Sequence, residues 1–312
     1  MSEPQPNQPT LPAESNVKTI IFMVVLSFIC ALILSVLASA LAKPKEVAKD
    51  LDRSKQMMIA AKILSHDGHF LIKDSEGNYV PAKYLKDGIL APDPAPGYAS
   101  QAELLSVYKQ RLRPMLVDSK GDLTTFEKAK LNEEEYLANY KKTGYYKQPL
   151  KLIYQILPNP STEAATEKGK QEPIGYVIPV NGFGLWDAIY GYLALNTDGN
   201  TVIGITWYDQ KETPGLGANI SEKEWQDLFP SKKIFQESGS GATDFKTAPL
   251  GITVVKGKVS EVLGDNPKAK SAVDGMAGAT LTGNGVNDAY KSVLAAYRPF
   301  LIKLQSAKQT KE

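Results

Sequence analysis

Asp274-Gly275-Met276-Ala277-Gly278-Ala279-Thr280-Leu281-Thr282 is the most informative stretch of this 312-residue chain. It joins a Gly-Ala-Thr turn to a segment in which apolar residues recur at three- and four-residue steps from Val286 to Tyr297. This spacing predicts a helix over residues 282–304. A helix N-terminus presents unsatisfied N–H groups and the positive end of the helix dipole, and both favour an anion. The threonine hydroxyl of the turn is therefore predicted to lie where a phosphate can be held.

Two further motifs precede this one, Gly184-Leu185-Trp186 and Glu212-Thr213-Pro214-Gly215-Leu216-Gly217. In this order the three resemble the signatures of the bacterial FMN-binding domain family, whose flavinylation motif reads Asp-x-x-(Ser/Thr)-Gly-Ala-Thr. The resemblance implies that Thr280 carries FMN covalently, through a phosphoester bond to its hydroxyl. One position departs from the pattern, because Ala277 stands where the family has Ser or Thr.

A second stretch, Glu237-Ser238-Gly239-Ser240-Gly241-Ala242-Thr243, contains a literal Ser-Gly-Ala-Thr. Its composition is that of a loop, and the short apolar run that follows it, residues 250–255, predicts a strand and not a helix. No helix N-terminus is therefore expected next to Thr243. We predict Thr280, and not Thr243, as the attachment site.

The resemblance also implies the other residues around the cofactor. The glycines of residues 212–217 would let the backbone approach the planar isoalloxazine ring, although Pro-Gly is also a common type II turn. Trp186 would form an apolar wall, or else belong to the core. Lys256 would pair with the phosphate or the ring, or else be a solvated surface lysine. The predicted cofactor-binding residues besides Thr280 are Asp274, Gly278, Ala279, Leu281, Thr282, Leu185, Trp186, Glu212, Thr213, Gly215, Leu216, Gly217 and Lys256.

Composition excludes several other classes of protein. The net charge is only +2, so nothing indicates a nucleic-acid surface, and a single cysteine, Cys30, rules out an internal disulfide or a thiolate cluster. His66 and His69 lack a third soft ligand, so no metal site is predicted. Neither a Gly-x-Gly-x-x-Gly loop nor a Walker motif is present, and no catalytic residues are assigned. This chain is therefore not expected to bind NADH itself.

Residues 19–42 contain no charged side chain. At ~1.5 Å per residue these 24 residues reach about 36 Å as a helix, enough to cross a bilayer core of ~30 Å. A cleaved signal peptide is the alternative, but its apolar region normally has only ~7–15 residues. We predict one transmembrane helix at 19–42, preceded by a proline-containing disordered cytoplasmic tail at 1–18.

The charges flanking this segment conflict with the resemblance. Lys18 is the one basic residue before it, whereas five basic residues lie in 43–55 directly after it. A positive-inside count would leave the large domain in the cytoplasm. The family resembled here places that domain in the periplasm, and we follow the family.

The remaining pattern predicts an α+β fold, an antiparallel sheet with flanking helices, preceded by the transmembrane helix. Helices are expected at residues 45–64, 101–112 and 124–141, and strands at 150–157, 174–180, 190–196, 201–208 and 250–255. Thr197-Asp198-Gly199-Asn200 is a strong hairpin signal. We predict a juxtamembrane mixed region at 43–148 and the FMN-binding domain at 149–312.

The arrangement of one membrane helix, a mixed region and the three motifs resembles the C subunit of sodium-translocating NADH:quinone reductases. This implies a component of an inner-membrane translocase that relays electrons toward quinone. Its partners would be the other subunits, especially B, D and E, and a flavin transferase for maturation. Two alternatives stay open: a flavoprotein like the G subunit of the Rnf complex, and an anchored periplasmic binding or scaffold domain without redox function.

Overall fold

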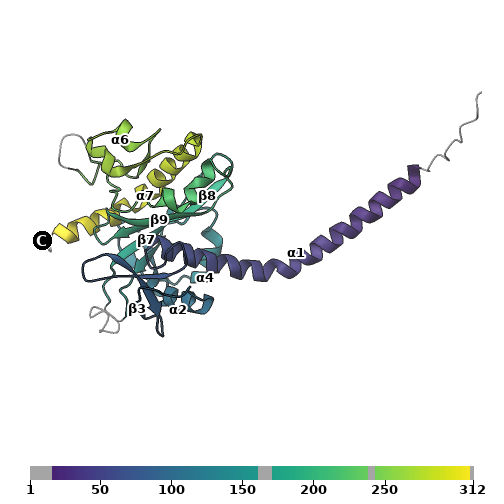
Figure 1. The fold of residues 1–312 in the computed structure, drawn as a ribbon, viewed down its shortest axis with the longest axis horizontal. Coiled ribbons are helices and arrows are strands. Elements are labelled where there is room, and N and C mark those ends of the chain that lie inside the picture. The colour runs from purple at the N-terminus through teal and green to yellow at the C-terminus, as the bar shows by residue number, and fades with distance from the viewer. Residues whose placement is uncertain (1–15, 161–170, 238–242, 310–312) are drawn as a thin grey trace, which may run out of the picture. The chain divides into compact units, whose positions relative to one another are not determined.

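The computed structural model describes residues 16–160, 171–237 and 243–309 (Figure 1). Its contacts divide the chain into two units, Met1–Asp50 and Leu51–Glu312. Helix α1 (Asn16–Ala60) contains the stretch Val17–Ala42, which is 26 residues long with a mean hydropathy of 3.1. At ~1.5 Å per residue it is about 39 Å long, so its length and composition suffice to cross a membrane. The predicted apolar helix at 19–42 is therefore present.

The second unit is built on a six-stranded antiparallel sheet with the order β5-β4-β6-β7-β8-β9. The strands are β4 (Leu112–Val117), β5 (Leu123–Thr124), β6 (Lys151–Ile156), β7 (Gly175–Phe183), β8 (Ala188–Asn196) and β9 (Val202–Asp209). Strands β8 and β9 form the predicted hairpin, with Gly199 at φ +61° in its turn. The predicted domain boundary between residues 148 and 149 lies between β4 and β6 in the chain. These two strands pair along their full lengths, so the sheet includes residues from both sides of that boundary.

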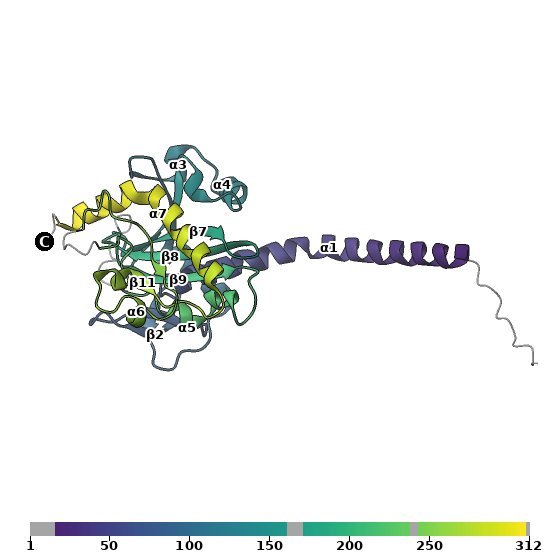
Figure 2. The ribbon, with the colours of Figure 1, turned by 90° about the horizontal axis from the view of Figure 1, so that it is seen from above.

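Helix α7 (Thr280–Gln309) covers one face of this sheet. Figure 2 shows α7, in yellow, lying over β7, β8 and β9. Val293 and Tyr297 of the helix share a buried cluster with Ile178 and Leu193 of the sheet. The Tyr297 hydroxyl donates a hydrogen bond to the backbone oxygen of Leu152 in β6, at 2.5 Å. The helix that begins at the Gly-Ala-Thr turn is thus held on the sheet along its length.

The opposite face of the sheet is buried as well. Met57 and Met58, near the end of α1, share a second cluster with Val177, Tyr192 and Ala194. These alternate along β7 and β8 with residues of the first cluster, because successive side chains of a strand point to opposite faces. Burial on both faces explains why these strands read as continuous apolar runs. The fold is α+β with flanking helices, as predicted.

A smaller antiparallel sheet and helix α2 also contribute to the second cluster. The sheet has the order β1-β2-β3, with β1 (Phe70–Lys73), β2 (Tyr79–Tyr84) and β3 (Leu90–Pro92). Helix α2 (Gln101–Arg111) agrees with the prediction. It begins with a capping box in which Ser100 and Glu103 bond each other's backbone amides. These elements lie in the part of the second unit that precedes β4 in the chain.

Several predicted elements differ from the structure in their bounds. Residues 124–141 form two short helices, α3 (Phe126–Ala129) and α4 (Glu133–Tyr140), because Lys130 adopts a left-handed conformation and Asn132 caps α4. The strand expected at 250–255 shrinks to β10 (Thr253–Val254), which pairs in parallel with β11 (Ala272–Val273). The last helix begins at Thr280, two residues earlier than predicted.

The remaining elements are short. They are the 3-10 helices η1 (Tyr145–Lys147), η3 (Gly217–Ser221) and η4 (Pro267–Ser271), and the single-turn helices α5 (Lys223–Gln226) and α6 (Val259–Val262). The predicted helix at 45–64 ends at Ala60, two residues before Lys62 takes a left-handed φ of +53°.

Candidate functional site

Thr280 is the first residue of α7, and its side chain is exposed. The turn before it depends on glycine at two points. Gly278 has φ +71°, a left-handed conformation that residues with a Cβ rarely adopt. A Cβ on Gly275 would lie 2.0 Å from the backbone oxygen of Val255, so this part of the motif runs directly against residues 255–257. Glycine thus brings the turn against a second chain segment and leaves the Thr280 hydroxyl at the helix N-terminus.

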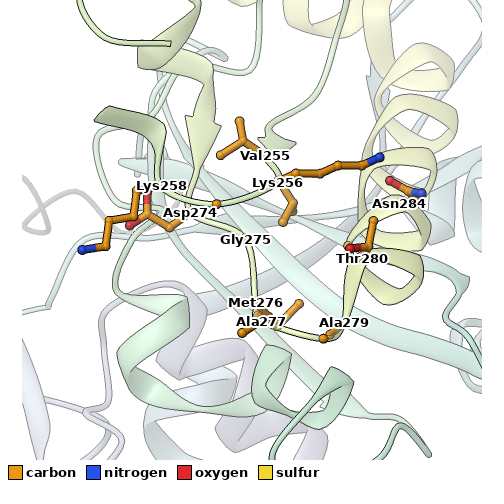
Figure 3. Close-up of a pocket in the computed structure, with 14 residues that line it drawn as sticks. Val255, Lys256, Lys258, Asp274, Gly275, Met276, Ala277, Ala279, Thr280 and Asn284 are labelled. Atoms are coloured by element: carbon orange, nitrogen blue, oxygen red, sulfur yellow. The ribbon is translucent and has the colours of Figure 1, made fainter. Parts of the chain in front are cut away.

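A cavity of about 350 Å³ lies in front of Thr280. Its lining consists of residues 254–258, residues 274–280, Gly283 and Asn284. In Figure 3 the side chain of Lys256 extends toward the start of α7, where Thr280 and Asn284 lie, whereas Lys258 points away from them. The cavity therefore combines a helix N-terminus, a hydroxyl, an amide and an ammonium group. Groups of these kinds donate hydrogen bonds to phosphate in proteins.

Glu212 joins all three sequence motifs. Its carboxylate accepts hydrogen bonds from the backbone amides of Leu185, at 3.1 Å, and Trp186, at 3.0 Å. It also accepts a bond of 2.5 Å from the Thr282 hydroxyl in the first turn of α7. The residue is 5% exposed. Burial alone raises the pKa of Glu212, but the bonds from Thr282, Trp186 and Leu185 outweigh it and leave that pKa below its usual value.

Two glycines of the motifs make room for this carboxylate. A Cβ on Gly184 would lie 2.4 Å from Glu212 Oε1, and a Cβ on Gly217 would lie 2.4 Å from Thr282 Oγ1. Gly215 differs from them, since it has φ +75° and a Cβ there would meet no atom within 4 Å. Glycine is therefore needed at positions 184 and 217 because there is no room for a side chain. At Gly215 it is needed because of the left-handed backbone conformation.

Large apolar side chains remain exposed around these motifs. They are Phe183, Leu185, Trp186, Leu216 and Leu281. Trp186 is 65% exposed and is held by a hydrogen bond of 3.1 Å from its indole N–H to the hydroxyl of Thr213. Leu216 lies against the Thr280 motif, because its Cδ2 is 2.9 Å from where a Cβ on Gly278 would be. A group of exposed apolar side chains marks a surface that binds an apolar partner or ligand.

The structure divides the predicted site residues into three groups. Those that line the cavity are Lys256, Asp274, Gly278, Ala279 and Thr280. Those in or beside the Glu212 hydrogen-bond network are Leu185, Trp186, Glu212, Thr213, Gly217 and Thr282. Gly215, Leu216 and Leu281 are exposed around the two. Because its hydroxyl is only 2.5 Å from Glu212 and the residue is 1% exposed, Thr282 is turned away from the cavity.

Asp274 has a structural role that the motif did not reveal. Its carboxylate accepts a hydrogen bond of 2.7 Å from the amide of Val259, the first residue of α6. Its backbone oxygen accepts one of 3.1 Å from the indole of Trp225. Asp274 therefore holds the loop that carries Lys256 against the Gly-Ala-Thr turn.

Sequence reasoning missed Asn284 in the cavity wall. The available signal was its spacing, since residues four apart on a helix lie on the same face and Asn284 follows Thr280 by four. The alternative Thr243 is followed by a turn at residues 245–247 and not by a helix. Residues 238–242 of that second motif lie outside the described part of the chain.

Comparison with known families gives one match and several relatives. The model of the FMN-binding domain family matches residues 184–295, which include all three motifs. A solved structure of the C subunit of the Na⁺-translocating NADH-quinone reductase from Parabacteroides distasonis covers 84% of this chain and 96% of its own, with 21% identity and a TM-score of 0.49.

Two relatives in sequence span nearly the whole chain. The C subunit of the Na⁺-translocating NADH-quinone reductase of Chlamydia muridarum is 44% identical over 289 residues, 90% of each chain. The protein of the same name from Vibrio campbellii is 32% identical and covers 94% of this chain and 96% of its own. The chain therefore contains an FMN-binding domain and belongs to the family of C subunits of the Na⁺-translocating NADH-quinone reductases.

Proposed function

We propose that this chain carries FMN on Thr280 through a phosphoester bond and relays electrons toward quinone within the reductase. The observation that carries the proposal is the hydrogen-bond network of Glu212, which brings the three motifs together beside the Thr280 cavity. When bound, FMN would supply reversible electron transfer, and the chain would supply its position and surroundings.

The described residues suit the two ends of such a cofactor. On the phosphate side, Lys256 and Asn284 line one cavity with Thr280 at the N-terminus of α7. On the ring side, Trp186 and Leu216 offer exposed apolar area next to the same turn. Asp274 would act on Lys256 only indirectly, by holding the adjacent loop.

The family suggests the rest of the assignment. We infer that residues 43–312 face the periplasm of a bacterial inner membrane and that the other subunits, B, D and E above all, are the partners. Electrons would come from an iron centre in neighbouring membrane subunits and pass to a second covalent FMN on the B subunit. A flavin transferase that uses FAD and releases AMP would form the bond to Thr280, since a phosphoester cannot be made from free FMN without activation.

The decisive experiment replaces Thr280 with Ala in the full chain, produced together with its flavin transferase. The substitution removes the oxygen that would bond to the phosphate, and even the loss of a capping hydroxyl would cost only about 0.5–2 kcal/mol. The variant should therefore fold but lack the added mass of one FMN and the fluorescent band on a denaturing gel. Intact-mass spectrometry measures the first and gel fluorescence the second.

Three matched variants complete the design. Thr280→Ser keeps a hydroxyl and should keep the flavin, as should Thr243→Ala. Thr282→Ala should also be flavinylated, at reduced occupancy, because it disturbs Glu212 but leaves Thr280 in place. A flavinylated Thr280→Ala chain would refute the proposal. Native protein without any covalent chromophore would favour the scaffold alternative.

A further inference from the structure

A second cavity, of about 700 Å³, lies in the same unit and shares no lining residue with the Thr280 cavity. It is formed by the small sheet β1-β2-β3, by residues 61–63 after α1, and by parts of β6 and β9. Its volume falls within the ~300–1,000 Å³ that ligand pockets usually have. Most of its lining is apolar, including Ile63, Leu71, Ile72, Ile156, Ile174 and Ile203.

One charged side chain in this apolar lining is buried and has no counter-ion among the residues that the structure describes. Arg111, the last residue of α2, is 5% exposed. Its Nε donates a hydrogen bond of 2.7 Å to the backbone oxygen of Leu157, while its Nη1 is buried and bonds no atom. Within the described residues no carboxylate forms an ion pair with it. Burial lowers the pKa of Arg111 to about 10, so the guanidinium still carries its charge near pH 7.

The other charged groups of the lining are already engaged. Lys62 forms an ion pair with Asp227 at 3.3 Å, and the ammonium of Lys73 lies 5.3 Å from the ring centre of Tyr79. Asp74 is the one carboxylate of the lining, and it accepts hydrogen bonds from two backbone amides of its own turn. Among the charged groups of the described lining, Arg111 is therefore the one with an unpaired charge and an unused N–H donor group.

We propose that this cavity binds a small anionic amphiphile, an apolar body that bears one carboxylate, and that Arg111 binds the carboxylate. A buried charge is costly unless it is paired, and a carboxylate supplies both the pairing charge and acceptors for the unused guanidinium N–H groups. The planar fork of Nη1 and Nη2 matches the two oxygens of a carboxylate. The isoleucine-rich walls accept the apolar body. This inference does not depend on the flavin assignment.

The test compares two probes of the same shape that differ in charge. Full-length protein in lipid nanodiscs is titrated with 3-phenylpropionate and with its neutral isostere 3-phenylpropanamide, by isothermal titration calorimetry at pH 7.5, with empty nanodiscs as the blank. The carboxylate should bind at least about tenfold more tightly, since hydrogen bonds to charged groups are the stronger ones.

Three variants test which residues bind the carboxylate and which contact the apolar body of the probe. Arg111→Met should abolish the preference for the carboxylate, whereas Arg113→Met, an exposed arginine two residues away and outside the lining, should preserve it. Ile174→Trp, at a 44% exposed position of the lining, should weaken the binding of both probes by filling part of the cavity.

Thermal denaturation of each variant shows whether it is folded. Should Arg111→Met unfold, the comparison of acid and amide in the unaltered chain and the Ile174→Trp variant still decide the matter. Equal affinity for acid and amide, absence of binding by either probe, or an unchanged preference in folded Arg111→Met would each overturn the proposal.

Discussion

At the scale of single residues, the site depends on one buried carboxylate. Glu212 accepts hydrogen bonds from three donors that belong to two other motifs, far apart in the chain. Such a group is tolerated at 5% exposure because its charge is fully hydrogen-bonded. Glutamine has nearly the same shape, but its NH₂ group donates and does not accept. The NH₂ group of the glutamine would face the N–H or O–H donor of Leu185, Trp186 or Thr282. That donor would then have no acceptor.

Glu212→Gln should therefore lower the free energy of unfolding by about 1–3 kcal/mol at pH 7. The pKa of Glu212 lies below its usual value in the folded chain, so its charged form stabilises the fold above the unfolded-state value of roughly 4.3. That contribution disappears as the pH falls through the folded-state pKa. The difference between the two proteins should thus shrink below about pH 4. Chemical denaturation of both proteins from pH 7 to pH 3 measures this difference in the free energy of unfolding.

Glu224→Gln is the matched control, because Glu224 is exposed on α5. Its unfolding free energy should stay within about 0.5 kcal/mol of the unaltered chain at every pH. A Glu212 variant that behaves like this control would mean that the carboxylate does not hold the motifs together.

At the scale of elements, the loop from β9 to η3 brings two kinds of glycine to the start of α7. Gly217 has an ordinary φ but no room for a Cβ, since Thr282 Oγ1 would be 2.4 Å away and Glu212 Oε2 2.8 Å away. Gly215 has room but a left-handed φ of +75°. The two positions should therefore respond differently to the same substitutions.

Asparagine separates the two cases, because it tolerates the left-handed conformation better than other side chains. We expect Gly215→Asn to fold and to be flavinylated like the unaltered chain. Gly217→Asn should lose flavin and stability, because its side chain displaces the bond between Thr282 and Glu212. Thermal denaturation and flavin content per chain are the measurements. The reverse ranking would show that this loop acts through its conformation alone.

At the scale of the whole molecule, the chain contains one apolar helix and one sheet-based unit. The helix is long enough to span a bilayer, but its flanking charges indicate the orientation opposite to the periplasmic one that we propose. In the proposed function, the surface that bears Trp186 and Leu216 would face a redox partner. That partner would have to lie on the same side of the membrane as the sheet-based unit.

Protease added to intact spheroplasts should digest residues 43–312 if they face the periplasm. A cytoplasmic marker protein should remain intact in the same sample, and an antibody against the C-terminus follows the loss of the domain. Protection of the domain until the cells are lysed would support the lysine count and contradict the periplasmic proposal.

Local patterns in the sequence are sufficient to predict much of the fold. The apolar helix, the hairpin around Gly199, the helix after the Gly-Ala-Thr turn and the α+β class follow from periodicity and turn chemistry, which act over a few residues. The capping preference of Asn132, by contrast, was present in the sequence and was overlooked within a longer helical pattern. The three motifs were visible one by one, because each is a short run of residues.

Their meeting point was decided only by the tertiary structure. Glu212 and Thr282 are 70 residues apart, and no local pattern indicates that they bond. The same holds for β4, whose pairing with β6 joins the regions on either side of residue 148. Thr280 and Thr282 are only two residues apart in the chain. The helix turns one toward the cavity and buries the other against a carboxylate, because successive residues of a helix face different directions.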